Sequence, residues 1–237
     1  MNLPELLEYC AALDKNNNRE WFRENHEWYD RARASFSELL VQLRFAVCSE
    51  APLLADDIMY MPVREWTYRV PRDMRIRRNV PPYNPSFRAY ISRDRRSSLP
   101  IGYYICLKPG ESCFGTGLWC PEPGTLSRVR SYICGSWREL DRLAAEYPGE
   151  IGGERLKRAP RGYTEDEPAA HWLRHKAFTL LRDVPDAAAS DADALCAFVA
   201  DRIREMEPLR QYLLRAAGQC TTQKKLMEDF YRFDTLE

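Results

Sequence analysis

A stretch rich in arginine, between residues 64 and 96, contains the residue type best suited to binding anions. It has ten arginines and three acidic residues, a local excess of seven positive charges, whereas the whole chain has 35 basic and 35 acidic residues. The planar guanidinium group presents a fork of N–H donors that matches a phosphate or a carboxylate group. The stretch therefore predicts a pocket that binds a small anionic ligand, while the rest of the chain carries the balancing negative charge.

Six residues of this stretch are predicted to line the pocket. They are Arg69, Arg72, Asp73, Arg75, Tyr83 and Arg88. Tyr83 would donate its hydroxyl to the ligand. Asp73 is expected to hold the arginines around it, Arg77 included, rather than to act as a general base, because neighbouring cations lower the pKa of a carboxyl group. No catalytic residue follows from the sequence, so whether the protein is an enzyme stays open.

Two other interpretations of the arginine-rich stretch stay open. The arginines could form surface salt bridges with the acidic remainder of the chain, since arginine is simply abundant here, with 29 Arg against six Lys. Aromatic residues also lie between the arginines, as in proteins that bind single-stranded nucleic acid by stacking its bases. The neutral net charge and the many prolines weigh against a nucleic-acid partner.

Two histidines and three cysteines have spacings that could suit a metal ion. His171 and His175 lie four residues apart on an expected helix, and Cys106, Cys113 and Cys120 are evenly spaced in an expected sheet. No CxxC or HExxH motif and no compact set of four ligands accompanies them, so the sequence predicts no metal and no cofactor. The cysteines are interpreted as buried free thiols, because a catalytic cysteine would need an activating base that no motif supplies.

The elements that position these residues begin with helices. Asn2 and Pro4 predict the start of a helix that runs to about Leu13, and the asparagines at 16–18 predict a turn. Apolar residues recur at helical spacing from residue 19 to about residue 49, which predicts one long helix. Residues 51–57 are expected to form a loop.

The middle of the chain is rich in aromatic and β-branched residues interrupted by proline, which indicates short strands joined by turns. The strands are expected at 86–91, 102–107 and 112–119. Gly115 and Gly117 lie in the last of these, too close together for a phosphate-binding loop. Glycines inside a strand instead mark a bulge or a close approach of two backbones.

Helical patterns return after residue 121, and Ser136 and Glu139 have the spacing of a capping box. Asp191 is expected to cap the last long helix. The expected helices are 125–133, 136–147, 168–176, 192–215 and a tail helix at 216–237, with short strands at 154–157 and 178–181.

Together these patterns predict an α+β fold, in which a central, mostly antiparallel sheet from residue 59 to residue 119 is flanked by N- and C-terminal helices. No linker marks a boundary, so residues 1–237 are expected to form a single domain. The sequence has no run of about 18 apolar residues, the length that a membrane span needs, and the N-terminus lacks the basic start of a signal peptide. We therefore expect a cytoplasmic protein with reduced cysteines and no membrane partner.

Several blocks of the sequence carry a family resemblance. The pattern R-x-x-R-D-x-R-F-x-x-[DN]-K-x-x-Y falls on Arg69, Arg72, Asp73, Arg75, Ile76, Asn79, Val80 and Tyr83. With the blocks at 16–22, 102–110, 115–123, 156–163 and 176–178, it resembles the bacterial domain-of-unknown-function family number 2461, over about residues 3–214. Ile76 replaces the usual Phe and Val80 the usual Lys, so a ligand contact made by that lysine would be lost or altered here. The family has no established activity, so the resemblance implies a fold rather than a reaction.

Two hypotheses about function follow. The first is the binding of a small phosphate- or carboxylate-bearing ligand in the arginine-lined pocket. The alternative is a non-enzymatic interaction module whose arginine and aromatic surface contacts an acidic partner protein. A small ligand that saturates competitively would favour the first, and a stable complex with a protein would favour the second. The identity of the ligand, the pathway and the oligomeric state do not follow from the sequence.

Overall fold

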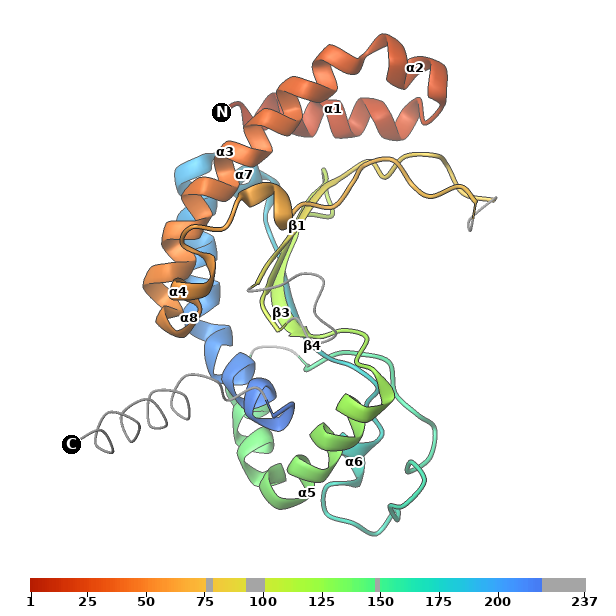
Figure 1. Cartoon of the computed structure of the whole chain (residues 1–237), viewed down its shortest axis with the longest axis vertical. Coiled ribbons are helices and arrows are strands. Elements are labelled where there is room, and N and C mark those ends of the chain that lie inside the picture. Colours follow the sequence, from red (N-terminus) through yellow and green to blue (C-terminus); the bar gives the residue numbers. More distant parts are fainter. Residues whose placement is uncertain (76–78, 93–100, 148–149, 219–237) are drawn as a thin grey trace, which may run out of the picture. The chain divides into compact units, whose positions relative to one another are not determined.

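The computed structural model describes residues 1–75, 79–92, 101–147 and 150–218 (Figure 1). Its internal contacts divide the chain into two compact units. The first unit comprises Met1–Thr116 and Leu181–Met206, and the second comprises Gly117–Leu180 and the chain from Glu207 onward. The single domain expected from the sequence stays a prediction. Within the described residues, no helix is both long enough and apolar enough to cross a membrane.

The first unit opens with helices α1 (Leu3–Lys15), α2 (Arg19–Glu24), α3 (His26–Glu50) and α4 (Pro52–Ile58). Helix α1 begins as predicted, because the side-chain oxygen of Asn2 accepts a hydrogen bond of 3.1 Å from the N–H of Glu5. The single helix predicted over 19–49 is wrong. The chain leaves helical geometry at Asn25, which ends α2 and precedes α3. The loop predicted at 51–57 is also wrong, since Pro52 starts α4 in the first turn, where its missing N–H costs nothing.

Three consecutive asparagines fix the turn between α1 and α2. Asn16 ends α1 through its backbone N–H, and Asn18 starts α2 by accepting a bond of 2.9 Å from the N–H of Trp21. The amide of Asn17 makes two bonds of 3.0 Å with the backbone of Tyr83, one to its carbonyl oxygen and one from its N–H. The sequence predicted the turn, but not that its middle asparagine holds the arginine-rich stretch against the N-terminal helices.

A four-stranded sheet is ordered β1-β2-β3-β4, with β1 (Phe87–Ile91), β2 (Tyr103–Leu107), β3 (Cys113–Leu118) and β4 (Phe178–Asp183). The pairs β1–β2 and β2–β3 are antiparallel. The predicted α+β class, with helices at both ends of the chain, is therefore confirmed. The sheet starts later than predicted, because the described residues of 59–75 and 79–86 contain the short 3-10 helix η1 (Val63–Glu65) and isolated bridges instead of strands.

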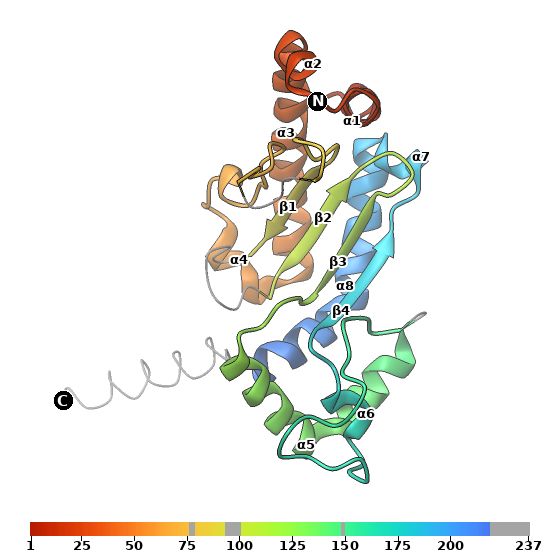
Figure 2. The same cartoon turned by 90° about the vertical axis from the view of Figure 1, so that its right-hand side faces the viewer.

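Helix α3 and the part of α8 (Ala192–Ala216) up to Met206 lie on the same face of the sheet in Figures 1 and 2. Between them and the strands lies a core of fully buried side chains, which includes Phe36, Leu40, Leu43, Ile105, Phe114 and Val199. Helix α8 begins as predicted, because the carboxylate of Asp191 accepts a bond of 2.7 Å from the N–H of Ala194. A short helix that the sequence did not predict, α7 (Asp186–Ala189), precedes it.

The second unit contains α5 (Pro123–Glu146), α6 (Ala170–Leu173) and the last part of α8. The two helices predicted at 125–133 and 136–147 are present as the two segments of α5, which are separated by a kink at Ser136, where the φ and ψ angles are not helical. The predicted capping box is wrong, since Ser136 donates to the carbonyl of Tyr132 at 2.8 Å and Glu139 pairs with Arg215. Residues 154–157 form only an isolated bridge, from Arg155 to His175. The predicted tail helix lies outside the described residues from 219 onward.

Candidate functional site

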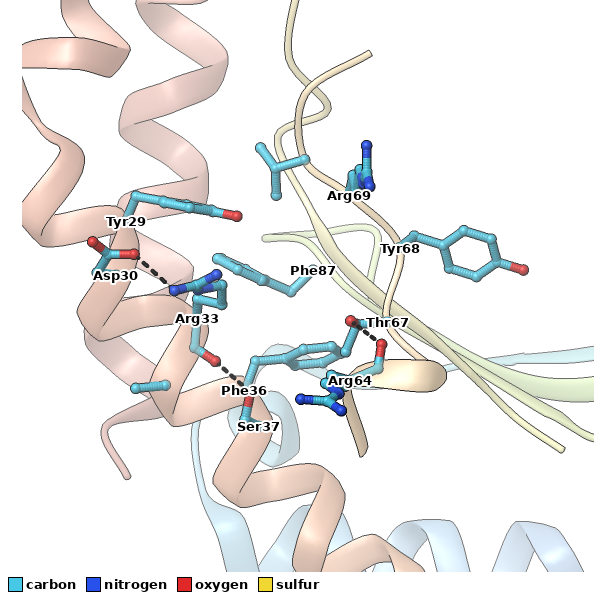
Figure 3. Close-up of a pocket in the computed structure, with 12 residues that line it drawn as sticks. Tyr29, Asp30, Arg33, Phe36, Ser37, Arg64, Thr67, Tyr68, Arg69 and Phe87 are labelled. Carbon is cyan, nitrogen blue, oxygen red and sulfur yellow. Dashed lines mark hydrogen bonds and ion pairs between the residues drawn. The ribbon is translucent and has the colours of Figure 1, made fainter. Parts of the chain in front are cut away.

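A pocket of about 320 Å³ lies in the first unit, between α3 and the segment that follows η1 (Figure 3). We call it the arginine pocket, because three arginines line it. Its lining residues are Tyr29, Asp30, Arg33, Ala34, Phe36, Ser37, Arg64, Thr67, Tyr68, Arg69, Val70 and Phe87. The pocket thus collects residues from the first half of α3, from the arginine-rich stretch and from β1.

Residues 67–70 form one wall of the arginine pocket, and backbone hydrogen bonds to β1 hold this wall in place. The N–H of Tyr68 donates to the carbonyl of Arg88 at 2.9 Å, and the N–H of Tyr90 donates to the carbonyl of Trp66 at 2.9 Å. Residues 66–68 therefore run beside the edge of the sheet, and they place Arg69 opposite Arg33 of α3. Helix α3 forms the opposite wall. This wall is rigid because the other side of the helix is packed in the core.

The three guanidinium groups differ in how much of their charge is already neutralised. Arg33 bonds the carboxylate of Asp30 at 3.1 Å, and Arg64 lies 3.7 Å from the carboxylate of Glu65. No described residue forms an ion pair or hydrogen bond with the guanidinium of Arg69, which is exposed. With one carboxylate against three arginines, the lining of the pocket has an excess of two positive charges.

The floor of the arginine pocket is apolar and well packed. Phe36, Val70 and Phe87 are each at most 4 % exposed, and the rings of Phe36 and Phe87 lie 5.6 Å apart between centroids. The ring of Tyr29 stacks on Phe87 at 6.2 Å. Charged groups at the rim of an apolar floor interact more strongly with a bound anion than the same groups would in water.

The structure brings only one of the six predicted residues, Arg69, into the arginine pocket. Arg72 donates to the carbonyl of Pro81 at 3.1 Å, and Asp73 pairs with Arg75 through two side-chain bonds of 2.7 and 3.0 Å. These bonds lie on an extended loop, whose two arms are joined by a bridge between Pro71 and Tyr83. Arg77 and Ile76 fall outside the described residues.

The pKa of Asp73 is shifted in the direction that the sequence predicted. Its side-chain bonds from Arg75, and then the backbone bond from the same residue, hold the pKa of its carboxyl below the usual value. The pair is exposed to solvent, so it is worth little in stability. Arg69 and Arg72 do not bond Asp73, so the cationic partner is one arginine and not the predicted cluster.

Tyr83 and Arg88 both lie outside the lining of the arginine pocket. The ring of Tyr83 is buried and stacks on Phe22, with the centroids 4.1 Å apart. Arg88 lies over the ring of Tyr68 at 5.4 Å, on the opposite side of β1 from Phe87. With the amide of Asn84 turned so that its oxygen faces Arg88, that oxygen accepts bonds of 2.7 and 3.0 Å from the guanidinium. A direct ligand contact by either residue stays a prediction.

Sequence reasoning missed Tyr29, Arg33 and Arg64 as members of the arginine pocket. Tyr29, Arg33 and Ser37 are four residues apart in turn and share one face of α3, where this spacing is normal for a solvated helix face. Arg64 lies in the arginine-rich stretch, but nothing in the stretch separates it from the other arginines. Only the tertiary structure selects these three.

His171 and His175, the two possible metal ligands, each form a hydrogen bond within the protein. The Nε2 atom of His171 lies 3.0 Å from the carboxylate of Asp141, which also accepts a bond of 2.7 Å from the indole of Trp172. His175 is 1 % exposed, and its Nδ1 atom bonds the carbonyl of Ala177 at 3.2 Å. Among the described residues, no group of three His, Cys, Asp or Glu side chains is arranged to hold a metal ion.

Acid is expected to destabilise the protein through His175. Burial, and then Arg155, lowers its pKa from 6.5 to about 4. Between these values the unfolded chain binds a proton that the folded chain does not, so the free energy of unfolding falls as the pH drops, by up to about 3 kcal/mol. Urea unfolding near pH 7 and near pH 4 measures this loss.

The variant His175→Asn keeps an N–H donor near the carbonyl of Ala177 but cannot gain the proton. It should lose less stability on acidification than the wild type. The control His171→Asn changes an exposed histidine four residues away and should retain the full loss. Equal acid sensitivity of all three proteins would show that His175 does not titrate as proposed.

Comparison with known sequences places the chain in a family. The sequence model described as "Conserved hypothetical protein (DUF2461)" matches residues 5–212. Comparison with curated proteins and comparison with solved structures each give no match. The match spans both units and the whole of the arginine pocket, and it covers most of the chain. The protein therefore belongs to DUF2461, a family of conserved hypothetical proteins.

Proposed function

We propose that the arginine pocket binds a small ligand that carries a phosphate or a carboxylate group. The observation that carries this proposal is that Arg33 of α3 and Arg64 and Arg69 of the arginine-rich stretch line one pocket with an apolar floor. Arginines that are only solvated surface residues are not expected to line the same pocket. An anion-binding site needs such convergence, because several donors must reach one group of oxygens.

Arg69 is the principal contact in this proposal. The charge of Arg33 is already partly neutralised by its ion pair with Asp30, so Arg33 would contact the ligand while that ion pair stays in place. Arg69 forms no bond to a described residue, so its fork of donors is available to a ligand without breaking an existing interaction. The floor of Phe36 and Phe87 suits an apolar part of the ligand, such as an aromatic ring.

The extended loop that carries the rest of the family pattern would support the pocket indirectly. The bonds that Arg72 donates to the carbonyls of Pro81 and Pro82 hold its two arms together. Asn17 fixes the returning arm at Tyr83. Val80 is 36 % exposed on this loop, so a lysine there would add its charge at the solvent surface.

Removal of Arg69 is expected to weaken ligand binding strongly. Phenyl phosphate is a suitable probe, because it combines a phosphate with an aromatic ring, and inorganic phosphate tests the anionic part alone. For Arg69→Ala, isothermal titration calorimetry should show the dissociation constant for phenyl phosphate rising by about ten- to a hundred-fold, the usual range for a lost charged hydrogen bond. Affinity should also fall with added salt.

The matched control is Arg75→Ala, which removes an exposed arginine six residues away that lies outside the pocket. It should leave the dissociation constant within about two-fold of the wild type, since it takes no ligand contact away. Equal losses in the two variants would place the site on the loop instead. If neither probe binds but an acidic peptide binds through Arg69, the alternative of a protein-interaction module is supported and the small-ligand proposal fails.

A further inference from the structure

Two cysteines face each other across neighbouring strands of the sheet. Cys106 of β2 and Cys113 of β3 are directly opposite in the antiparallel register, and both are free thiols. Directly opposite residues in such a pair have Cα atoms about 4.5–5.5 Å apart, which is inside the range of about 4.4–6.8 Å found for disulfides. In this register the two side chains lie side by side on the same face of the sheet. A disulfide could therefore close without moving the strands.

The residues around Cys106 form a polar cluster on one face of the sheet. Arg88 of β1 is opposite Cys106 on its other side, and Tyr104 lies two residues earlier on the same strand, so all three share a face. The side chains of Tyr104 and Ser86 also lie close enough to Cys106 to lower the pKa of its thiol. Each of these neighbours stabilises a negative sulfur.

The charges around the pair distinguish its two thiols. Interactions with Cys113, Tyr104 and Ser86, together with the nearby charge of Arg88, lower the pKa of Cys106 to about 7, although burial acts in the opposite direction. The pKa of Cys113 is raised, first by its interaction with Cys106 and then by burial and the charge of Asp183. Lys108 and the buried thiol of Cys10 also lie within electrostatic range of Cys106. Cys106 is thus the thiolate of the pair, and Cys113 is its proton-bearing partner.

We propose that Cys106 and Cys113 form a redox-active dithiol site that reduces low-molecular-weight disulfides. Cys106 is the attacking residue, and Cys113 resolves the mixed disulfide. Cys106 is 9 % exposed, so the substrate must be small. The site is independent of the arginine pocket, because Phe87 faces that pocket and Arg88, the next residue, lies on the opposite side of β1.

The reaction has two exchange steps. The thiolate of Cys106 attacks one sulfur of a disulfide RSSR, whose S–S bond breaks, so that Cys106 carries –SR and RS⁻ leaves. Cys113 then gives up its proton, and its sulfur attacks the Cys106 sulfur and expels the second RS⁻. The two cysteines lose two electrons to RSSR, and the two thiol protons end on two RSH. Return to the dithiol needs an external dithiol reductant.

Arg88 is a positioning residue for this chemistry. Asn84 and the ring of Tyr68 hold its guanidinium, and its buried Nε atom has no hydrogen-bond partner among the described residues. Its charge favours the thiolate of Cys106 over the thiol. Arg88→Met should therefore slow the alkylation of Cys106 by iodoacetamide at neutral pH and shift its pH profile upward, without preventing disulfide closure at higher pH.

The central experiment treats the full-length protein with oxidised glutathione and maps the cysteines by mass spectrometry. Glu111 lies between the two cysteines, so cleavage after Glu111 separates their peptides unless a disulfide joins them. The wild type should give the joined peptides. Cys113→Ser should stop at a glutathione adduct on Cys106, and Cys106→Ser should leave Cys113 reduced, reacting at least about ten-fold more slowly.

The control Cys48→Ser changes a half-buried cysteine of the same unit and should give the wild-type result. A second readout needs no variant: in the wild type, the alkylation rate of Cys106 should reach half its maximum near pH 7, and that of Cys113 only at much higher pH. The proposal is overturned if the exposed Cys120 and Cys134 react with glutathione while Cys106 and Cys113 stay reduced. It is equally overturned if Cys106 and Cys113 alkylate with the same pH profile.

Discussion

Replacing Glu207 with alanine is expected to lower the free energy of unfolding by about 3–5 kcal/mol. Glu207 and Arg210 lie in the second unit, on the last part of α8, and are 8 % and 2 % exposed. Two side-chain bonds of 2.6 and 2.7 Å join them as a parallel fork. An arginine stays charged at any ordinary pH, so the variant leaves that charge buried with its carboxylate removed. Urea unfolding measures the loss.

A neighbouring pair on the same helix gives a matched control. Asp201 and Arg204 have the same spacing and a similar bond of 2.8 Å, but their side chains are more than half exposed. Asp201→Ala should cost less than about 1 kcal/mol, because water screens the pair. The double replacement Glu207→Leu with Arg210→Met removes both buried charges and should recover part of the stability lost in Glu207→Ala. A double variant less stable than Glu207→Ala would show that the cost comes from lost packing and not from removing this carboxylate from the buried charge of Arg210.

Replacing Gly117 with alanine is expected to cost about 4 kcal/mol, from backbone strain and overpacking together. Gly117 has a φ angle of +144°, which residues with a side chain rarely adopt. A Cβ atom there would lie 2.2 Å from the carbonyl oxygen of Phe178 and 2.7 Å from the Cα of Thr179. Both are backbone atoms of β4, so they cannot turn aside as the end of a side chain could. Thermal and urea unfolding should both show the loss.

Gly135 provides the comparison for this variant. It lies within α5, and an added Cβ would meet no atom within 4 Å. Gly135→Ala should therefore be neutral or stabilising by up to about 1 kcal/mol, since alanine favours the helix. If Gly117→Ala is no less stable than Gly135→Ala, the close approach of the two strands is not a constraint on the fold.

The sequence by itself determined the features that depend on residues close together in the chain. Asn2 and Asp191 start helices where they were expected, because a side-chain cap bonds a backbone N–H three residues away. The strands β1, β2 and β3 lie within the predicted ranges, since runs of aromatic and β-branched residues bounded by turn residues are local signals. The strand glycine Gly117 does mark a close approach of two backbones, as its type and setting predicted.

The tertiary structure alone decided which of these residues meet. The arginine pocket joins Arg33 to Arg64 and Arg69, and no pattern in the sequence links a polar position on a helix to a loop about thirty residues later. The pairing of Cys106 with Cys113 depends on strand register, in which a shift by one residue would turn either thiol to the other face. Local patterns specify elements, but a site forms only where packing of distant segments brings particular side chains together. For that reason the sequence predicted an anion-binding stretch, whereas the fold decided which of its arginines, Arg64 and Arg69, line the arginine pocket.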